Sequence, residues 1–233
     1  MAAAIEVSNL VYTYSDDMPF HQDVSFSIED GEKVALVGAN GAGKSTLLYQ
    51  LNGILQGKGA VRIQGLELNQ RNLSHIRALV GLVFEIPDDQ LFSPTVYEDV
   101  AFGPRYQNLP RHVVDQRVQQ ALTQVHMEKY ARQAPQHLSQ GEKKRVAIAT
   151  VLSMQPSILL LDEPTNGLDR RSRRSLITLL QDLPQTMLIA THDLEMATMI
   201  TRRTLLMDGG KIVADGNTTD ILTNEDLLLR HGL

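Results

Sequence analysis

The nonapeptide GANGAGKST at residues 38–46 places the strongest constraint on how this chain can fold. It matches the phosphate-loop pattern G-x-x-x-x-G-K-[ST] and lies between the short apolar run KVALV (33–37) and the helical pattern STLLYQLNG (45–53). Glycines let such a loop turn its N–H groups inward around phosphate oxygens, and the helix N-terminus adds partial positive charge. The sequence therefore predicts a buried strand, a phosphate-binding loop and a helix, in that order.

Two further stretches supply candidates for phosphate chemistry. In the loop, Lys44 would reach the β- and γ-phosphates of a nucleotide, and the Ser45 hydroxyl would bind Mg²⁺. In SILLLDEP (157–164), an apolar strand ends at Asp162, at the edge of an open α/β sheet where ligands bind. Asp162 is a natural partner for Mg²⁺, and Glu163 is the candidate general base that polarises the attacking water.

Strand and helix patterns alternate along most of the chain, which predicts an α/β fold with a mostly parallel sheet covered on both faces. The predicted strands are 5–14, 23–28, 33–37, a short one within 57–65, 78–84, 157–162, 186–191, 203–208 and 211–216. The predicted helices are 45–53, 95–103, 111–125, 139–154, 170–183, 194–200 and a short one in 224–233. Since strand signals vanish after about residue 93, we predict a single domain over 1–233 with an inserted helical lobe at approximately 93–155.

Composition narrows the functional classes. The formal net charge of −5 argues against a nucleic-acid partner, because proteins that bind nucleic acids normally carry an excess of basic residues. The absence of cysteine excludes disulfides, thiol catalysis and cysteine metal sites. The N-terminus lacks signal-peptide features, and the longest apolar run, SILLL (157–161), is far too short to span a bilayer. We therefore expect a cytoplasmic protein that reaches a membrane only through a partner.

A third candidate element is LSQGEKKRVAIA (138–149). Ser139 and Gly141 lie at the start of a strongly helical stretch, and a capped helix start can bind an anion. The simplest interpretation of the basic run at residues 143–145 is a solvated helix face.

These motifs, in this order, resemble the ATP-binding-cassette (ABC) family over residues 14–215. GANGAGKST matches the family's phosphate loop, and LSQGE matches its LSGGQ-type signature, with Gln140 for the usual glycine and Glu142 for the usual glutamine. LLLDEPTNGLD and ATHD match the segments that carry the magnesium aspartate, the catalytic glutamate, the D-loop and the switch histidine. The resemblance implies a P-loop ATPase cassette with an N-terminal antiparallel β part, a mostly parallel core sheet and an inserted helical subdomain.

The resemblance also implies ATP as substrate, Mg²⁺ as cofactor and a full set of site residues. The implied nucleotide-binding residues are Tyr14, Gly38, Asn40, Gly41, Ala42, Gly43, Lys44, Ser45, Thr46, Ser139, Gly141 and Asp169. The implied catalytic residues are Glu163, His192 and Glu85, and the implied metal ligands are Ser45, Asp162 and Glu85.

Two cassettes meet head to tail in this family, so Ser139 and Gly141 of one chain would close on the γ-phosphate held by Lys44 of the other. Tyr14 matches the aromatic residue that stacks on adenine, and Tyr12 is the alternative.

The stretch VFEIPDDQLFSPTVYEDVAFGP (83–104) looks like the energy-coupling-factor ATPases, which drive uptake of metal ions or vitamins. This resemblance implies an integral-membrane scaffold subunit, a substrate-binding membrane subunit and a peripheral place at the cytoplasmic face of the membrane. The segments GEKKRVAIA and LLLRHGL suit the cobalt/nickel branch, and the short stretch after the cassette core favours a homodimer. The alternatives are a vitamin such as biotin, a soluble ABC ATPase outside transport, or an ATP sensor without turnover.

Glu85 stands where the family has its Q-loop glutamine. Three readings remain open: a metal ligand, a group that slows hydrolysis until the scaffold docks, or a silent substitution. A carboxylate binds Mg²⁺ more strongly than an amide but cannot donate a hydrogen bond when ionised. Gln90 is expected to be a loop surface residue, and the arginines at 170, 171, 173 and 174 are expected to form a solvated helix face.

Overall fold

The computed structural model describes residues 3–13 and 19–233 and divides into two compact units. Unit 1 comprises residues 1–82, 157–163 and 184–233, and unit 2 comprises residues 83–156 and 164–183. Unit 1 carries the sheets and unit 2 carries most of the longer helices. The predicted α/β fold, with an antiparallel N-terminal part, a mostly parallel core sheet and a helical part, is confirmed.

The first sheet of unit 1 is antiparallel and has the strand order β2-β1-β4-β5. Its strands are β1 (Ala3–Thr13), β2 (Pro19–Glu29), β4 (Lys58–Ile63) and β5 (Leu66–Glu67). In β1, Ile5 and Val7 are buried while Glu6 is half-buried, as alternation on a sheet with one covered face requires.

The second sheet has the order β10-β9-β3-β8-β7-β6. Its strands are β3 (Lys33–Val37), β6 (Val80–Val83), β7 (Ile158–Asp162), β8 (Thr186–Thr191), β9 (Arg203–Asp208) and β10 (Lys211–Asn217). Strands β9, β3, β8 and β7 are parallel neighbours, and β10 pairs antiparallel with β9. Every residue of β7 and β8 is buried, which explains why these strands are continuous apolar runs rather than alternating ones.

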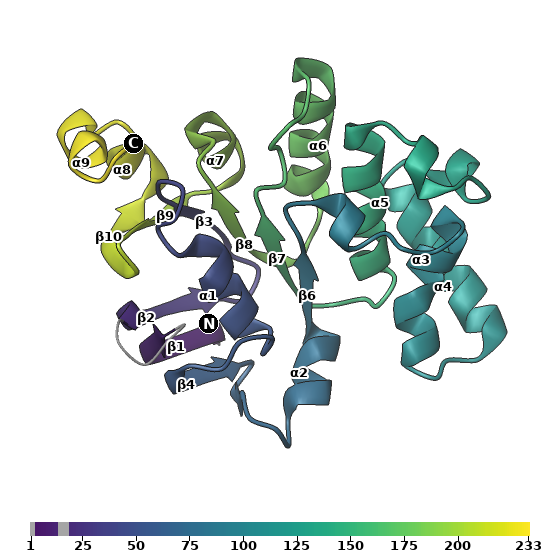
Figure 1. Cartoon of the computed structure of the whole chain (residues 1–233), viewed down its shortest axis with the longest axis horizontal. Coiled ribbons are helices and arrows are strands. Elements are labelled where there is room, and N and C mark those ends of the chain that lie inside the picture. The colour runs from purple at the N-terminus through teal and green to yellow at the C-terminus, as the bar shows by residue number, and fades with distance from the viewer. Residues whose placement is uncertain (1–2, 14–18) are drawn as a thin grey trace. The chain divides into compact units, whose positions relative to one another are not determined.

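Figure 1 labels the helices that accompany these sheets among the described residues of unit 1. They are α1 (Lys44–Leu51), α2 (Leu73–Leu79), α7 (Leu194–Ile200), α8 (Thr218–Leu222) and α9 (Glu225–Arg230). Helix α1 packs on β7 and β8, and α7 packs on β3 and β8. The strand predicted at 78–84 starts only at Val80, because Ala78 and Leu79 complete α2, a helix that the sequence did not predict.

Unit 2 is built from helices. They are α3 (Val96–Tyr106), α4 (Arg111–Gln124), α5 (Gln140–Leu152) and α6 (Arg170–Asp182), with 3₁₀ turns at Pro87–Asp89, Glu128–Tyr130 and Pro135–His137. Helices α3, α4 and α5 pack on one another. The unit also takes in α6, which lies outside the predicted lobe at 93–155. Within the described ranges, no helix is both long and apolar enough to cross a membrane.

The basic run at 143–145 is not the solvated face that we expected. Lys144 is only 3% exposed. Lys143 forms an ion pair with Asp88 at 2.6 Å, and Arg145 donates to the Val125 carbonyl at 3.0 Å and to Ser175 Oγ at 2.6 Å. The basic run therefore ties α5 to neighbouring segments of unit 2.

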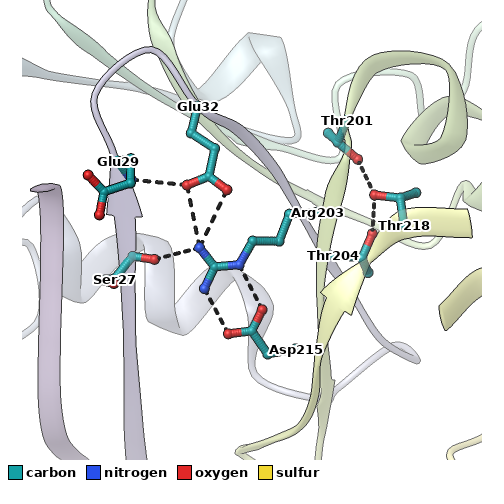
Figure 2. Close-up of polar contacts among 8 residues, drawn as sticks. All are labelled: Ser27, Glu29, Glu32, Thr201, Arg203, Thr204, Asp215 and Thr218. Carbon is teal, nitrogen blue, oxygen red and sulfur yellow. Dashed lines mark hydrogen bonds and ion pairs between the residues drawn. The ribbon is translucent and has the colours of Figure 1, made fainter. Parts of the chain in front are cut away.

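An arginine joins the two sheets of unit 1 at the start of β9 (Figure 2). Arg203 makes a bidentate pair with Asp215 of β10, at 2.7 Å for both bonds, and donates to the Ser27 carbonyl of β2 at 2.9 Å. Glu32 lies 3.4 Å from the same guanidinium. The pKa of Arg203 is raised, first by the hydrogen bonds to Asp215. Because Arg is planar and always charged, one side chain can hold both sheets.

Candidate functional site

The phosphate loop at 38–43 connects β3 to α1 and contacts the end of β9 and the turn that leads into β10. Gly210 N donates to the Ala42 carbonyl at 3.0 Å, and a side chain at Gly38 would lie 2.3 Å from the Met207 carbonyl oxygen. Gly43 caps α1 in the left-handed region, at φ 110°. Glycine is therefore required at 38 for space and at 43 for backbone conformation.

Lys44 lies inside the curve of this loop and is only 6% exposed. Its ammonium donates to the carbonyls of Gly38 at 2.8 Å and Ala39 at 3.2 Å, and lies 3.5 Å from Glu163 Oε1. A buried cation with two carbonyl acceptors and one carboxylate neighbour is well compensated. The predicted phosphate-binding lysine is thus held in the loop that the motif defines.

Ser45 and Asp162 meet at the carboxyl end of β7. Ser45 Oγ donates to Asp162 Oδ1 at 2.9 Å, and Asp162 is 1% exposed. A hydroxyl and a carboxylate oxygen are hard donors that suit Mg²⁺. No group of three or more His, Cys, Asp or Glu side chains gathers as a metal site anywhere in residues 3–13 and 19–233. The Ser45 hydroxyl and the Asp162 carboxylate fit an ion that takes two protein oxygens and completes its shell with phosphate and water.

Glu163 has a strained backbone, at φ 42°, directly after β7. Its N–H donates to the Ala190 carbonyl at 2.9 Å. Its carboxylate accepts from the Thr191 hydroxyl at 3.2 Å and the His192 N–H at 3.3 Å, and lies 2.9 Å from His192 Nδ1. The carboxyl ends of β7 and β8 thus bring the predicted base and histidine into contact. Thr191 is a partner that the sequence analysis missed, since a threonine ending a strand carries no distinctive signal.

His192 is exposed enough to bind a phosphate or a water molecule while it contacts Glu163. Its side chain is 47% exposed, whereas that of Glu163 is 7% exposed. When Glu163 is ionised it can only accept, so Nδ1 of His192 carries the proton and Nε2 remains available to a phosphate or water.

In unit 2, Ser139 caps helix α5 through a capping box. Glu142 N donates to Ser139 Oγ at 3.4 Å, and Glu142 Oε2 accepts from Ser139 N at 2.9 Å and Ser139 Oγ at 2.7 Å. Hydrogen bonds from Tyr130 and Ser139 lower the pKa of Glu142. Glu142, which stands in place of the family's glutamine, thus has a structural role, because its ionised carboxylate accepts from both the N–H and the hydroxyl of Ser139.

The glycine of the signature permits a close approach of two helix starts. A Cβ at Gly141 would lie 2.9 Å from both Cβ and Oγ of Ser172, in the first turn of α6. Ser172 Oγ donates to Asp169, which caps α6, at 2.8 Å. Hydrogen bonds from Ser172, foremost its backbone N–H, lower the pKa of Asp169. Gln140 is exposed and does not occupy this contact.

Glu85 also lies in unit 2, where its Oε1 accepts from Asn166 Nδ2 at 2.7 Å. Gln90 is not the loop surface residue that we expected. It accepts from Phe84 N at 3.1 Å and donates to the Ala147 carbonyl at 2.9 Å and to Thr150 Oγ1 at 2.7 Å. Gln90 therefore anchors the loop around Glu85 to helix α5.

The predicted site residues are divided between the two units. Unit 1 brings together Lys44, Ser45, Asp162, Glu163 and His192, and unit 2 carries Ser139, Gly141, Asp169 and Glu85. Tyr14 lies outside the described residues, so its predicted contact with adenine stays a prediction. Tyr12, the alternative, is half-buried in β1 with its ring centroid 6.5 Å from that of His21.

Comparison with known proteins places this site in a family. The ABC transporter family model matches residues 21–166. The chain is 45% identical over 235 residues to the energy-coupling factor transporter ATP-binding protein EcfA of Methanothermobacter thermautotrophicus, covering 98% of this chain and 76% of that protein.

Two solved structures share the fold. One is cbiO1 of Clostridium perfringens, part of the ABC transporter complex cbiONQ, with a TM-score of 0.88 and 35% identity over 99% of this chain and 94% of that one. The other is a dimeric bacterial ABC transporter cassette, with a TM-score of 0.81 and 27% identity over 92% of this chain and 98% of that one. This chain therefore belongs to the ABC transporter family and is an ATP-hydrolysing cassette of that family.

Proposed function

We propose that this chain is the ATPase subunit of an energy-coupling-factor importer for cobalt or nickel ions. It would dock as a homodimer on an integral-membrane scaffold subunit, at the cytoplasmic face of the membrane, and work with a substrate-binding membrane subunit. The observation that carries the proposal is the stretch at 83–104, which has the energy-coupling-factor form in a chain similar to EcfA and to cbiO1 of the cbiONQ complex. The choice of cobalt or nickel as the transported ion is based on the resemblance of GEKKRVAIA and LLLRHGL to the cobalt/nickel branch.

Exposed apolar side chains along this stretch, and at Tyr106 just after it, support a protein partner. Ile86 is 53% exposed, Phe92 67%, Phe102 53% and Tyr106 80%. The rings of Phe92 and Phe102 stack edge to face with centroids 5.2 Å apart. Large exposed apolar groups on one segment are typical of an interaction surface, and a membrane scaffold is the partner that the resemblance implies.

The roles proposed for unit 1 follow from its contacts. Lys44 would leave the loop carbonyls and Glu163 to bind the β- and γ-phosphates of ATP. Ser45 and Asp162 would hold Mg²⁺, which supplies neutralisation of phosphate charge when it is bound. Glu163 would accept the proton of the attacking water, and His192 would orient that water and contact the γ-phosphate through Nε2.

The roles proposed for unit 2 require a second copy of the chain. Ser139 and Gly141 of one copy would present the start of α5 to the γ-phosphate held by the other, where backbone N–H groups favour an anion. Asp169 would keep the start of α6 in place beside Gly141. ATP binding would close the dimer, and hydrolysis would let it open and drive the scaffold.

Stimulation of ATPase activity by the membrane subunits is the expected result that tests this function. Activity would be measured against Mg²⁺ for the purified chain alone and with its co-expressed membrane subunits. We expect stimulation, and we expect the Phe92→Ser/Phe102→Ser double variant to lose it because the apolar contact is removed. Leu229→Ser, at a side chain 73% exposed in α9, is the matched control and should keep it.

Equal activity with and without the membrane subunits would contradict a transport motor. Uptake of labelled cobalt, nickel and biotin by vesicles containing the complex assigns the substrate, and biotin uptake without metal uptake would overturn the proposed cobalt or nickel specificity.

Glu85→Gln is expected to change the Mg²⁺ dependence of ATP hydrolysis. The variant keeps the oxygen that accepts from Asn166, so the substitution removes charge and little else. If Glu85 ligates Mg²⁺, loss of that charge should raise the half-activating Mg²⁺ concentration by about fivefold, which corresponds to roughly 1 kcal/mol. Steady-state ATPase assays over a Mg²⁺ series give the measurement, with exposed Glu128→Gln as the control. Identical magnesium curves for the variant and the parent would rule out the ligand role.

A further inference from the structure

A buried histidine touches the phosphate loop from the first sheet of unit 1. His21, near the start of β2, is 0% exposed, and no sequence motif singled it out. Its Nε2 lies 3.0 Å from the Gly43 carbonyl oxygen, and its Nδ1 lies 2.7 Å from Gln50 Nε2. Gln50 is itself 1% exposed, in α1. A polar ring in the protein interior is thus connected at both nitrogens to the loop and to the helix that follows it.

The chemistry of these partners fixes the direction of both hydrogen bonds. A backbone carbonyl can only accept, so Nε2 of His21 must carry a proton and donate to Gly43. Burial, partly opposed by these hydrogen bonds, holds the pKa of His21 below its ordinary value, which favours the neutral ring. In the neutral ring Nδ1 accepts, so the Gln50 amide donates to it and selects the tautomer that donates to the loop.

The hydrogen bond from His21 orients one peptide of the loop. The Gly43 carbonyl already accepts the first helical bond of α1, from Leu47 N at 3.0 Å, so His21 occupies its second lone pair. Because the peptide is planar and trans, fixing this oxygen on the side of His21 aims the Lys44 N–H in the opposite direction. The adjacent Ala42 carbonyl is held in the same manner by Gly210 N. The carbonyls of Ala42 and Gly43 thereby point away from the inside of the loop. The N–H groups of Gly43 and Lys44, which are trans to these carbonyls, are left to bind an anion.

We propose that His21 is a positioning residue for ATP binding, which holds the Gly43–Lys44 peptide of the phosphate loop in its anion-binding orientation through a tautomer set by Gln50. This inference rests on the proposed role of residues 38–46 in binding the phosphates. It assigns no chemical step to His21, which acts only through the loop.

His21→Leu separates this role from simple filling of the core. Leucine occupies the space without a donor, whereas His21→Gln places an amide N–H at a similar distance from the backbone. We expect His21→Leu to raise the Kd and the KM for ATP by about five- to tenfold, the range expected for one hydrogen bond. The kcat should change little, since phosphates are held in both ground and transition states. His21→Gln should recover most of the lost affinity for ATP. The affinity of Gln50→Leu should lie between those of the parent and of His21→Leu.

Titration calorimetry with Mg·ATP and steady-state ATPase assays give these values, with thermal melting of each variant to monitor stability. Exposed His75→Leu is the matched control and should bind ATP as the parent does. Unchanged ATP affinity in folded His21→Leu, or equal loss in His21→Gln and His21→Leu, would overturn the proposal. If His21→Leu does not fold, Gln50→Leu decides, since parental affinity there contradicts the tautomer argument.

Lys44→Ala in the same titration distinguishes failure of this inference from failure of the proposed phosphate site. Weak binding in Lys44→Ala together with parental binding in the His21 variants would overturn only the role of His21. Parental binding in Lys44→Ala would overturn both.

Discussion

Replacing Glu163 with glutamine is expected to lower the kcat for ATP hydrolysis by about 10²- to 10⁴-fold, the usual contribution of a general base. Glutamine keeps the shape of the side chain but cannot take a proton from water. Its oxygen can still accept from the Thr191 hydroxyl and the His192 N–H. Its amide can donate to Nδ1 of His192 if that ring adopts its other tautomer. The fold and ATP binding should therefore survive while turnover is lost.

Single-turnover hydrolysis and ATP titration of Glu163→Gln would be compared with those of the parent. The exposed Glu225→Gln in α9 is a control with the same chemical change and no contact with the site. We expect ATP to remain bound to the Glu163 variant long enough to accumulate the ATP-loaded dimer. Parental turnover in Glu163→Gln would remove Glu163 as the base and leave its carboxylate with a structural role beside His192.

Lys44→Ala is expected to weaken ATP binding by about 100-fold or more, since charge-assisted hydrogen bonds to two phosphates are lost. Arginine at this position should not rescue binding. The ammonium lies between the carbonyls of Gly38 and Ala39 with only 6% exposure, and a planar guanidinium needs more room. Lys44→Ala also removes the cation that lies 3.5 Å from buried Glu163, so the melting temperature of this variant should change as well.

Calorimetric titration of Mg·ATP measures the affinity of the Lys44 variants, and Lys211→Ala, exposed at the edge strand β10, controls for loss of a positive charge. Parental affinity in Lys44→Ala would show that the loop does not bind phosphate as proposed.

The sequence was sufficient for the elements whose signals are local. The apolar runs at 33–37, 158–162 and 186–191 became buried parallel strands, because residues covered on both faces of a sheet need no alternation. The order of strand, glycine loop and lysine was enough to place Lys44 and Ser45 at the start of α1. Helix α2 escaped detection, since its seven residues contain a single buried side chain, Ile76, and so lack an amphipathic pattern.

Only the tertiary structure decided which distant side chains act together. Glu163 and His192 are 29 positions apart, and they meet because β7 and β8 are parallel neighbours whose carboxyl ends share one edge of the sheet. His21 acquires its contact with Gly43 through the packing of the first sheet against the loop, which no local pattern encodes. Gln90 and Lys144 look like surface residues in the sequence, but hydrogen bonds to α5 hold Gln90, and Lys144 is buried. The sequence thus determined which groups the chain offers for phosphate chemistry, while long-range packing determined their partners and hence what each group can do.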